Sequence, residues 1–412
     1  MANNVRIDKS LLQIYQAAIS AVKGEACVEK RLQSLSLSGP LTMVAIGKAA
    51  ASMARGAIDV LRDQIEIGLV ITKHGHADPA LAFETIEAGH PTPDAESLHA
   101  GQRLLALIED SPEGQPFLFL ISGGASALVE VLPEGMGLEQ LQQATDWLLG
   151  SGLDIHRMNR VRKGLSLIKG GRLAEKLTGH PVTNLMISDV PGDDMSAIGS
   201  GLLLADKDTE IDVKGLPDWL AEALLKGSVA PAADAPCFER VQNEIIASNR
   251  IALDAAEEQA RALGLVVHRH AEPISGSAEA MAKRVIETVQ QTPGLHIWGG
   301  ESTVVLPEHP GRGGRNQHLA LHVAKLINGR DDMWVLAAGT DGSDGPTEDT
   351  GALVDGGSVA RGELHYKAGQ GGIEQALMDF DAGSYLQASG DLLQTGPTGT
   401  NVMDVILAYR QM

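Results

Sequence analysis

Short apolar runs that show no alternation with polar residues recur through the first half of the chain. They cover residues 41–47, 67–72, 117–121 and 182–188, and helical patterns lie between them. A strand without alternation is typical of burial on both faces, and a helix between successive strands gives a βαβ unit. We therefore predict an α/β fold built on a parallel sheet, with its chemistry gathered at the carboxyl ends of the strands.

A second region of strand and helix patterns lies beyond a segment of different composition. Residues 206–235 carry several prolines and acidic side chains, which indicates the neighbourhood of a domain boundary, and strand-then-loop patterns resume beyond them. A chain of 412 residues also exceeds the size of one ordinary core. We predict one domain at residues 1–240 and a second α/β domain at residues 241–412.

The bulk composition narrows the class of protein. A net charge of −20 argues against a general nucleic-acid binder, which needs a basic face. No run approaches the roughly 18 consecutive apolar residues of a membrane span, and residues 1–24 have the spacing of an amphipathic helix rather than of a signal peptide. Cys27 and Cys237 lie far apart, as expected in a reducing compartment. We expect a cytoplasmic protein without nucleic-acid or membrane partners.

The segment FLFLISGGASAL directs an apolar strand into a corner of glycines and other small residues. In one interpretation, backbone amides around Gly123 and Gly124 seat an anion, because helix N-termini bind anions readily. In a second, Ser126 is a nucleophile; in a third, the small residues only allow a tight strand-to-helix turn. Lys48 and Asp189 also follow strands, so we expect all of these residues at the same edge of the sheet.

Basic side chains concentrate in DIHRMNRVRKGLSLIKGGRLAEK, where we predict a long helix over residues 155–168. Arg160 and Lys163 lie on one face of that helix, three residues apart. The segment is either a solvated face that neutralises acidic neighbours or an electropositive wall for a phosphorylated or carboxylated ligand.

Three carboxylates occur together in SDVPGDD, just after a strand. Asp193 and Asp194 could serve as turn and helix-capping residues alone. Alternatively, one of them holds Mg²⁺, which takes one or two carboxylates and completes its shell with water and phosphate oxygens. Asp189 is a candidate to accept a proton from a substrate hydroxyl.

The second half of the chain has a glycine-and-arginine loop, GRGGRNQ, directly before a helical pattern. Arg312 and Arg315 have the fork geometry that suits carboxylate or phosphate, and a helix start adds amide donors. Glu301 follows a strand in GGE, and Asp341 and Asp344 follow another in GTDGSDG. Asp341 and Asp344 are interpreted either as magnesium ligands or as residues of a simple turn.

Several common site motifs are absent. Lys48 is not part of GxxxxGK[ST], because Thr42 stands where the first glycine belongs. No GxGxxG follows a strand, which weighs against a Rossmann-type dehydrogenase. The nucleophile elbow GxSxG fails around Ser126, where the sequence is GASAL.

Taken together, the ordered motifs AIGKAAASMARGA, GHPTPD, LISGGASAL, MNRVRKGLSLIKGGRLA, SDVPGDD, IGSG, ASN, GGE, GRGGRNQ, GTDGSDGPT and TGPTGTN resemble the class II glycerate 2-kinases, the MOFRL-type glycerate kinases. The resemblance implies a Rossmann-like N-terminal domain, a smaller C-terminal α/β domain and an active site in the cleft between them. It also implies ATP-dependent phosphorylation of D-glycerate at its 2-hydroxyl, with Mg²⁺. Some members of the family carry the older label hydroxypyruvate reductase.

The resemblance assigns Lys48 as catalytic and Arg315 as its partner. Our hypothesis adds Asp189 to orient or deprotonate the attacking hydroxyl, and Asp193 or Asp341 to hold the metal. The nucleotide-binding candidates are drawn from the same motifs: Ser122, Gly123, Gly124, Ser126, Lys163, Asn249, Gly300, Glu301, Gly313, Gly314 and Asn316.

Three other functions stay open at this stage: an NAD(P)H-dependent hydroxypyruvate reductase, a serine hydrolase that uses Ser126, and a sensor of sugar acids or phosphate. The expected small-molecule partner is D-glycerate, and the sequence leaves open whether the chain forms a homodimer.

Overall fold

The computed structural model describes residues 6–37, 39–151, 153, 155–206, 212–366 and 371–412. The chain forms two compact units. The N-terminal unit comprises residues 24–246, and the C-terminal unit comprises residues 247–412 together with residues 1–23. Each unit has its own sheet and is described by itself.

The elements of the N-terminal unit follow in chain order: α2 (Gly24–Leu32), β1 (Leu41–Ile46), α3 (Ala50–Leu61), η1 (Arg62–Gln64), β2 (Ile65–Lys73), β3 (Glu84–Ala88), α4 (Ala95–Glu109), β4 (Phe117–Ile121), α5 (Ala125–Leu128), α6 (Leu138–Gly150), α7 (Ile155–Gly164), α8 (Arg172–Lys176), β5 (Val182–Ile187), η2 (Pro191–Asp193), η3 (Ile198–Ser200), α9 (Asp218–Leu225), η4 (Pro236–Phe238) and β6 (Val241–Ala247).

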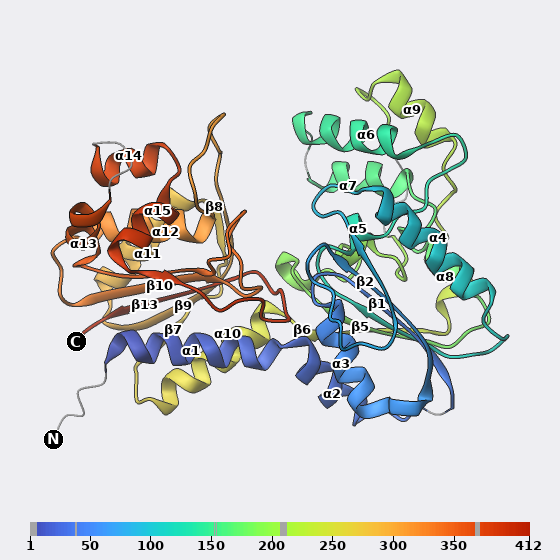
Figure 1. The fold of residues 1–412 in the computed structure, drawn as a ribbon, viewed down its shortest axis with the longest axis horizontal. Helices are drawn as coiled ribbons and strands as arrows, with labels where there is room; N and C mark the ends of the chain where they lie inside the picture. Colours follow the sequence, from blue (N-terminus) through green and yellow to red (C-terminus); the bar gives the residue numbers. More distant parts are fainter. Residues whose placement is uncertain (1–5, 38, 152, 154, 207–211, 367–370) are drawn as a thin grey trace. The chain divides into compact units, whose positions relative to one another are not determined.

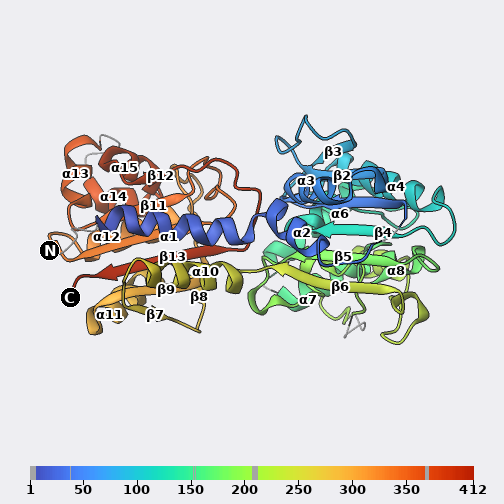
Figure 2. The same ribbon diagram turned by 90° about the horizontal axis from the view of Figure 1, so that it is seen from below.

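The sheet of the N-terminal unit has six strands in the order β3-β2-β1-β4-β5-β6 (Figure 2). The pairings of β1 with β2 and β4, of β2 with β3 and of β4 with β5 are all parallel. This is the strand order of Rossmann folds, in which the order reverses between β1 and β4. The α/β prediction is confirmed. Ligands of such sheets bind beyond the carboxyl ends of the strands at this switch point.

The central strands of this sheet are fully buried, which explains their lack of alternation. β1 and β4 are buried at every position. Val44, Ile46, Phe117 and Phe119 belong to one apolar core with Leu104 of α4. Burial on both faces is what a parallel sheet requires, and it fixes the strand ends as a rigid base for the loops that follow them.

The elements of the C-terminal unit are α1 (Ile7–Val22), α10 (Asn249–Ala262), β7 (Val267–Arg269), β8 (Ile274–Ser277), α11 (Ala278–Gln291), β9 (Gly294–Thr303), α12 (Arg315–Leu326), β10 (Met333–Gly339), β11 (Gly351–Asp355), α13 (Ser358–His365), α14 (Gly372–Met378), α15 (Ala382–Ser389), β12 (Leu392–Leu393) and β13 (Asp404–Arg410).

The sheet of the C-terminal unit is mixed, with the order β12-β11-β10-β13-β9-β7 and β8 paired to β9. β13 is antiparallel to both β10 and β9, whereas β7 and β8 are parallel to β9. Helices α1 and α10 lie on one face of the sheet, and α11 and α12 lie on the other (Figure 1). Strand β13 therefore has a neighbouring strand on each side, and helices cover both faces of the sheet.

Helix α1 packs with the C-terminal unit, although the sequence analysis grouped residues 1–23 with the N-terminal domain. Its apolar positions Leu11, Ile14, Tyr15 and Val22 are almost fully buried, and the helix lies along α10. Their spacing of three and four residues makes one apolar stripe. The stripe predicts a buried helix face but carries no information about which distant segment covers it.

One helix is shorter than predicted, and another is very short. Helix α7 ends at Gly164 instead of continuing to residue 168, because Ser166 turns the chain with its side chain accepting from the amides of Ile168 and Lys169. The glycine corner leads into α5, which has only four residues. Helix α4 is capped at its start, where the Asp94 carboxylate accepts from the amide of Ser97.

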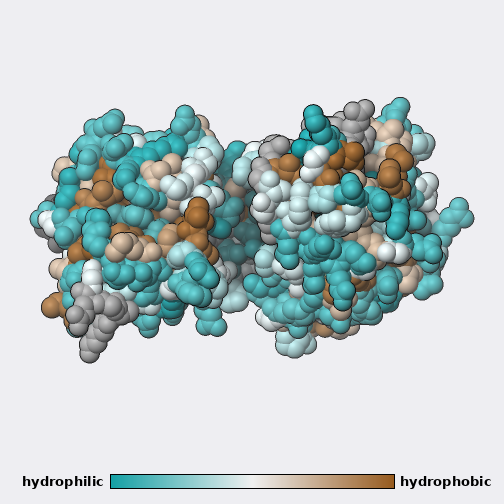
Figure 3. Space-filling view, turned by 90° about the horizontal axis from the view of Figure 1, so that it is seen from above, coloured by the Kyte–Doolittle hydropathy of each residue, from teal (hydrophilic) through white to brown (hydrophobic). Residues whose placement is uncertain are grey.

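The surface of each unit is mostly hydrophilic on the face that Figure 3 shows, with smaller hydrophobic groups on both. None of the described helices is both long enough and apolar enough to cross a membrane.

Candidate active site

The ends of β1 and β4 are bonded to one another at the switch point. The Lys48 amide donates to the Gly123 carbonyl at 2.9 Å, and the Ser122 amide donates to the Ile46 carbonyl at 2.9 Å. The Ala49 amide donates to Ser122 Oγ at 3.0 Å. These bonds fix the backbone of Lys48 beside the glycine corner, as predicted from the strand pattern.

Gly47 makes this close approach of the two strand ends possible. It has a φ of +132°, and a Cβ at this position would lie 2.1 Å from Ser122 Oγ and 2.6 Å from the Ser122 carbonyl oxygen. Any side chain would therefore clash with backbone as well as adopt a strained conformation. The Gly47–Lys48 pair is a structural requirement of the site and not part of a phosphate loop of the GxxxxGK[ST] type.

The glycine corner is covered by the loop that follows β5. Gly124 is in the left-handed region, with a φ of +88°. The hydroxyls of Ser126 and Ser200 lie 2.6 Å apart, so Ser126 bonds to a second serine. This contact gives no support to a nucleophile elbow, and it joins the IGSG motif to the corner.

A cavity of about 200 Å³ opens beside the corner within the N-terminal unit. It is lined by His90, Pro91, Pro93, Gly124, Ser126, Ala127, Glu130, Leu141, Thr145, Arg162, Lys169 and Ser200. An ideal Cβ on Gly124 would lie 3.0 Å from the His90 ring and 3.3 Å from Lys48 Cγ. The Lys48 side chain therefore starts next to the cavity, and His90 forms part of the cavity wall.

Two basic side chains of the predicted electropositive wall line this cavity, but Lys163 does not. Burial lowers the pKa of Arg162. Lys169 forms a buried ion pair with Glu130. Lys163 Nζ lies 2.9 Å from Asp206 Oδ2, in a pair that is almost entirely buried. Lys163 thus stabilises the fold of its own segment through Asp206, a partner distant in sequence that no motif identifies.

The acidic loop after β5 contains both turn residues and candidate functional residues. Asp194 accepts from the Ser196 amide at 3.0 Å and from the Ser196 hydroxyl at 2.8 Å, which is the turn chemistry considered from the sequence. Asp189 is half-buried directly beyond β5, at the same sheet edge as Lys48. Asp193 has a φ of +56° and is half-buried.

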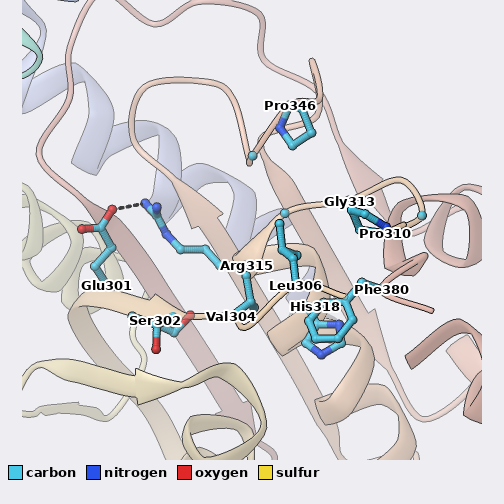
Figure 4. Close-up of a pocket in the computed structure, with 14 residues that line it drawn as sticks. Glu301, Ser302, Val304, Leu306, Pro310, Gly313, Arg315, His318, Pro346 and Phe380 are labelled. Atoms are coloured by element: carbon cyan, nitrogen blue, oxygen red, sulfur yellow. Dashed lines mark ion pairs between the residues drawn. The ribbon is translucent and has the colours of Figure 1, made fainter. Parts of the chain in front are cut away.

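Arg315 is held as a rigid fork at the start of α12. Its Nε and Nη2 atoms donate to the two oxygens of Asp404 at 2.8 and 2.9 Å. Glu301 approaches from the other side at 2.5 Å (Figure 4). Burial alone would lower the pKa of Arg315, but the hydrogen bonds and charges of Asp404 and the charge of Glu301 raise it above its usual value. Arg315 is therefore permanently cationic and oriented.

The amides at the start of α12 are occupied by a carboxylate of the protein. The Asp344 carboxylate accepts from the amides of Asn316 at 3.1 Å and Gln317 at 2.8 Å. Burial raises the pKa of Asp344 to about 7, although these two bonds oppose the shift. A Cβ on Gly314 would lie 2.3 Å from Asp344 Cγ. The predicted amide donor of Asn316 thus already has a partner, and Gly314 is needed for the close approach of Asp344.

Asn249 and the GGE glycines also have packing roles. The Asn249 side chain donates to the carbonyls of Val402 at 2.8 Å and Asp404 at 3.0 Å, which fixes the start of β13. A Cβ on Gly299 would lie 1.7 Å from Asn249 Oδ1, and a Cβ on Gly300 would lie 2.4 Å from the Ile274 carbonyl oxygen. Asn249 therefore supports Asp404, and through it Arg315.

Asp341 lies at the end of β10, close to the same carboxylates. It accepts from the Ser343 amide at 3.1 Å and from the Ser343 hydroxyl at 3.2 Å. Its charge and that of Asp404 contribute, after burial, to a raised pKa of Tyr15. No group of three or more His, Cys, Asp or Glu side chains with the geometry of a metal site occurs among the residues that the structure describes.

A larger cavity, of about 430 Å³, lies within the C-terminal unit beside Arg315 (Figure 4). It is lined by Glu301, Ser302, Thr303, Val304, Leu306, Pro310, Gly311, Gly313, Gly314, Arg315, His318, Gly345, Pro346 and Phe380. It brings four of the predicted residues together: Glu301, Gly313, Gly314 and Arg315.

Sequence reasoning missed Asp404, the residue that orients Arg315. It is 1% exposed and stands at the start of the apolar strand β13. A single charged residue in the run VMDVILAY was the available signal, because a buried charge in a strand requires a partner.

The chain is similar to known proteins over nearly its whole length. Residues 10–222 match the family profile described as a domain of unknown function (DUF4147), and residues 294–404 match the MOFRL family. A D-glycerate 2-kinase of Thermotoga maritima is 38% identical over 97% of this chain and 98% of its own length. A glycerate 2-kinase of Pyrococcus horikoshii is 35% identical over 96% and 93%. A putative hydroxypyruvate reductase of Agrobacterium vitis is 35% identical over 98% and 94%.

Two solved structures have the same fold. The crystal structure of a glycerate kinase of Thermotoga maritima superimposes with a TM-score of 0.85 and 34% identity, over 98% of this chain and 99% of that one. The structure of a protein of Pyrococcus horikoshii gives a TM-score of 0.77 with 32% identity, over 100% and 99%. From its two family domains and these near full-length relatives, the chain belongs to the glycerate kinase family of the MOFRL type.

Proposed function

We propose that this chain is a glycerate 2-kinase, which transfers the γ-phosphoryl group of ATP to the 2-hydroxyl of D-glycerate. The observation that carries the proposal is the fixed position of Lys48, bonded through its backbone to the glycine corner at the switch point of the sheet. The similarity to glycerate 2-kinases over nearly the whole chain supports the same activity and supplies the choice of the 2-hydroxyl.

The chemistry of phosphoryl transfer matches the side chains available. Such transfer depends on positioning and on neutralising negative charge, more than on covalent catalysis. Lys48 and Arg315 supply cationic groups for the transferring phosphoryl and the substrate carboxylate, and the amides of Gly123 and Gly124 supply neutral donors. Lys48, Gly123 and Gly124 belong to the N-terminal unit, and Arg315 belongs to the C-terminal unit.

The two carboxylates at Arg315 have different tasks in this proposal. Asp404 is 2% exposed at its side chain and binds through both oxygens, so it keeps the guanidinium oriented. Glu301 is 42% exposed at its side chain, so solvent screens its attraction and a phosphate or carboxylate of the ligand can displace it. Asp189 is assigned to orient the attacking hydroxyl and accept its proton.

The residues present fit a weakly held Mg²⁺ and do not form a dedicated cage. Mg²⁺ commonly uses one or two protein carboxylates and completes its shell with phosphate oxygens and water, so a cluster of three acids is not required. Asp193 and Asp341 are each half-buried carboxylates, and one or the other is the proposed ligand. When bound with ATP, the ion neutralises charge on the phosphates. We also propose a cytoplasmic location, supported by the two free cysteines.

A pair of assays on the purified protein tests the proposal. ADP release is measured with D-glycerate, ATP and Mg²⁺, and oxidation of NADH or NADPH is measured with hydroxypyruvate. The proposal expects ADP release that depends on glycerate and no oxidation of either nicotinamide. Oxidation without ADP release would instead support the reductase named for the Agrobacterium vitis relatives.

A further inference from the structure

We infer that the 430 Å³ cavity of the C-terminal unit binds the purine base of the nucleotide. The inference rests on the proposed function, because it assigns a place to one part of the ATP that the kinase uses. It goes further by naming the residues that would recognise the base. The volume of the cavity is within the range of small-ligand sites, about 300–1,000 Å³.

The walls of this cavity suit a flat heteroaromatic ring. Val304, Leu306, Pro310 and Pro346 contribute apolar surface, and the rings of His318 and Phe380 lie at the cavity in a parallel stack (Figure 4). The stacked ring centroids are 4.3 Å apart with an interplanar angle of 5°. Apolar and aromatic walls with a few polar groups are typical of sites for planar ligands.

Two buried polar atoms of residues that line the cavity have no hydrogen-bonding partner among the residues that the structure describes. They are His318 Nδ1 and Ser302 Oγ, and their side chains belong to residues that are 7% and 3% exposed. Leaving a buried donor or acceptor unpaired costs free energy. A ligand that hydrogen-bonds to these atoms would remove that cost, and the edge of adenine offers both an amine donor and ring-nitrogen acceptors.

The histidine pair makes His318 adaptable as a partner for the base. His318 Nε2 lies 3.2 Å from His322 Nε2, so one of the two rings donates to the other. Burial lowers the pKa of His318 to about 4, and the ring is therefore neutral near pH 7. His318 Nδ1 can then act as either donor or acceptor, depending on the tautomer.

The other cavity is a poor candidate for the base. It is smaller, about 200 Å³, and is lined by Arg162, Lys169 and serine hydroxyls. These groups suit the carboxylate or phosphate of a small anion. In the C-terminal unit, by contrast, Arg315 and Glu301 lie at the edge of the apolar cavity, where a base in the cavity would direct its phosphates toward the guanidinium.

Two neighbouring residues provide a matched test. Leu306 lines the cavity and is 56% exposed, whereas Val305 does not line it and is 88% exposed, so both positions tolerate substitution. Leu306→Glu places a charge in the apolar wall, and Val305→Glu places the same charge on the same loop outside it. We expect Leu306→Glu to raise the calorimetric Kd of ADP at least about tenfold, and Val305→Glu to change it less than about twofold. Inorganic tripolyphosphate, which lacks a base, should bind equally to both variants.

Ser302→Ala adds a readout that a general loss of structure would not give. Removing a buried, unpaired hydroxyl should leave the Tm unchanged or raise it, while the affinity for ADP falls several-fold. The inference is overturned if Leu306→Glu and Ser302→Ala both bind ADP as tightly as the wild type, or if Leu306→Glu weakens tripolyphosphate to the same extent as ADP. Failure of the wild type to release ADP with glycerate would contradict the proposed function itself, and calorimetric ADP binding tests the cavity in either case.

Discussion

At the scale of single residues, the account depends first on Lys48. Lys48→Ala should lower kcat roughly 100- to 1,000-fold, as loss of one preorganised charge-stabilising group does. The Tm should hardly change, because the bonds that fix this position use the backbone amide. Lys73→Ala is the matched control, since Lys73 ends the neighbouring strand β2. Equal activity of the two variants in a glycerate-dependent ADP assay would contradict the role of Lys48.

Asp344 gives a second prediction at this scale, on stability. Its pKa is raised by burial from 3.8 to about 7 in the folded protein. The unfolded chain therefore releases this proton at lower pH, and the folded protein binds more protons between these values. The free energy of unfolding of the wild type, relative to Asp344→Asn, should fall as pH rises from 4 to 7, by at most about 4 kcal/mol. Parallel urea titrations of both proteins across this range check it; a constant difference would show that the carboxylate is not desolvated.

At the scale of elements, the junction of β1 and β4 is the feature that positions the site. Gly47→Ala forces a side chain against Ser122 and strains a backbone with a φ of +132°. We expect a loss of at least about 2 kcal/mol in unfolding free energy together with a lower kcat. Gly150→Ala, at a position with open space and an ordinary φ, should leave both unchanged. A fully active and stable Gly47→Ala variant would show that the two strand ends need not meet this closely.

The elements also show what the sequence could and could not reveal. The strands and the placing of Lys48 beside Gly123 follow from local patterns and from the rule on strand ends. The Arg315–Asp404 pair joins residues 89 positions apart, and no local motif specifies it. Lys163 was expected to bind the nucleotide, but it pairs with Asp206. The sequence could not reveal this pair, because tertiary packing brings the two residues together.

At the scale of the whole molecule, the C-terminal unit contains both ends of the chain: residues 1–23 pack with residues 247–412. Ile14 of α1 is fully buried within the C-terminal unit. Ile14→Asp should therefore speed hydrogen exchange in α10 and β13 while residues 24–246 keep their protection, because burying an unpaired carboxylate costs several kcal/mol. Gln13→Asp, on the exposed side of α1, should have no such effect. Loss of protection confined to residues 24–246 would contradict the assignment of α1.

The central claim is that this chain transfers a phosphoryl group from ATP to the 2-hydroxyl of D-glycerate, with Lys48 as an essential cation. Phosphorus NMR of the reaction products tests it most directly, because 2-phosphoglycerate and 3-phosphoglycerate give separate resonances. We predict 2-phosphoglycerate as the sole phosphorylated glycerate from the wild type and none above background from Lys48→Ala in the same time. Formation of 3-phosphoglycerate, or undiminished product from Lys48→Ala, would contradict the account.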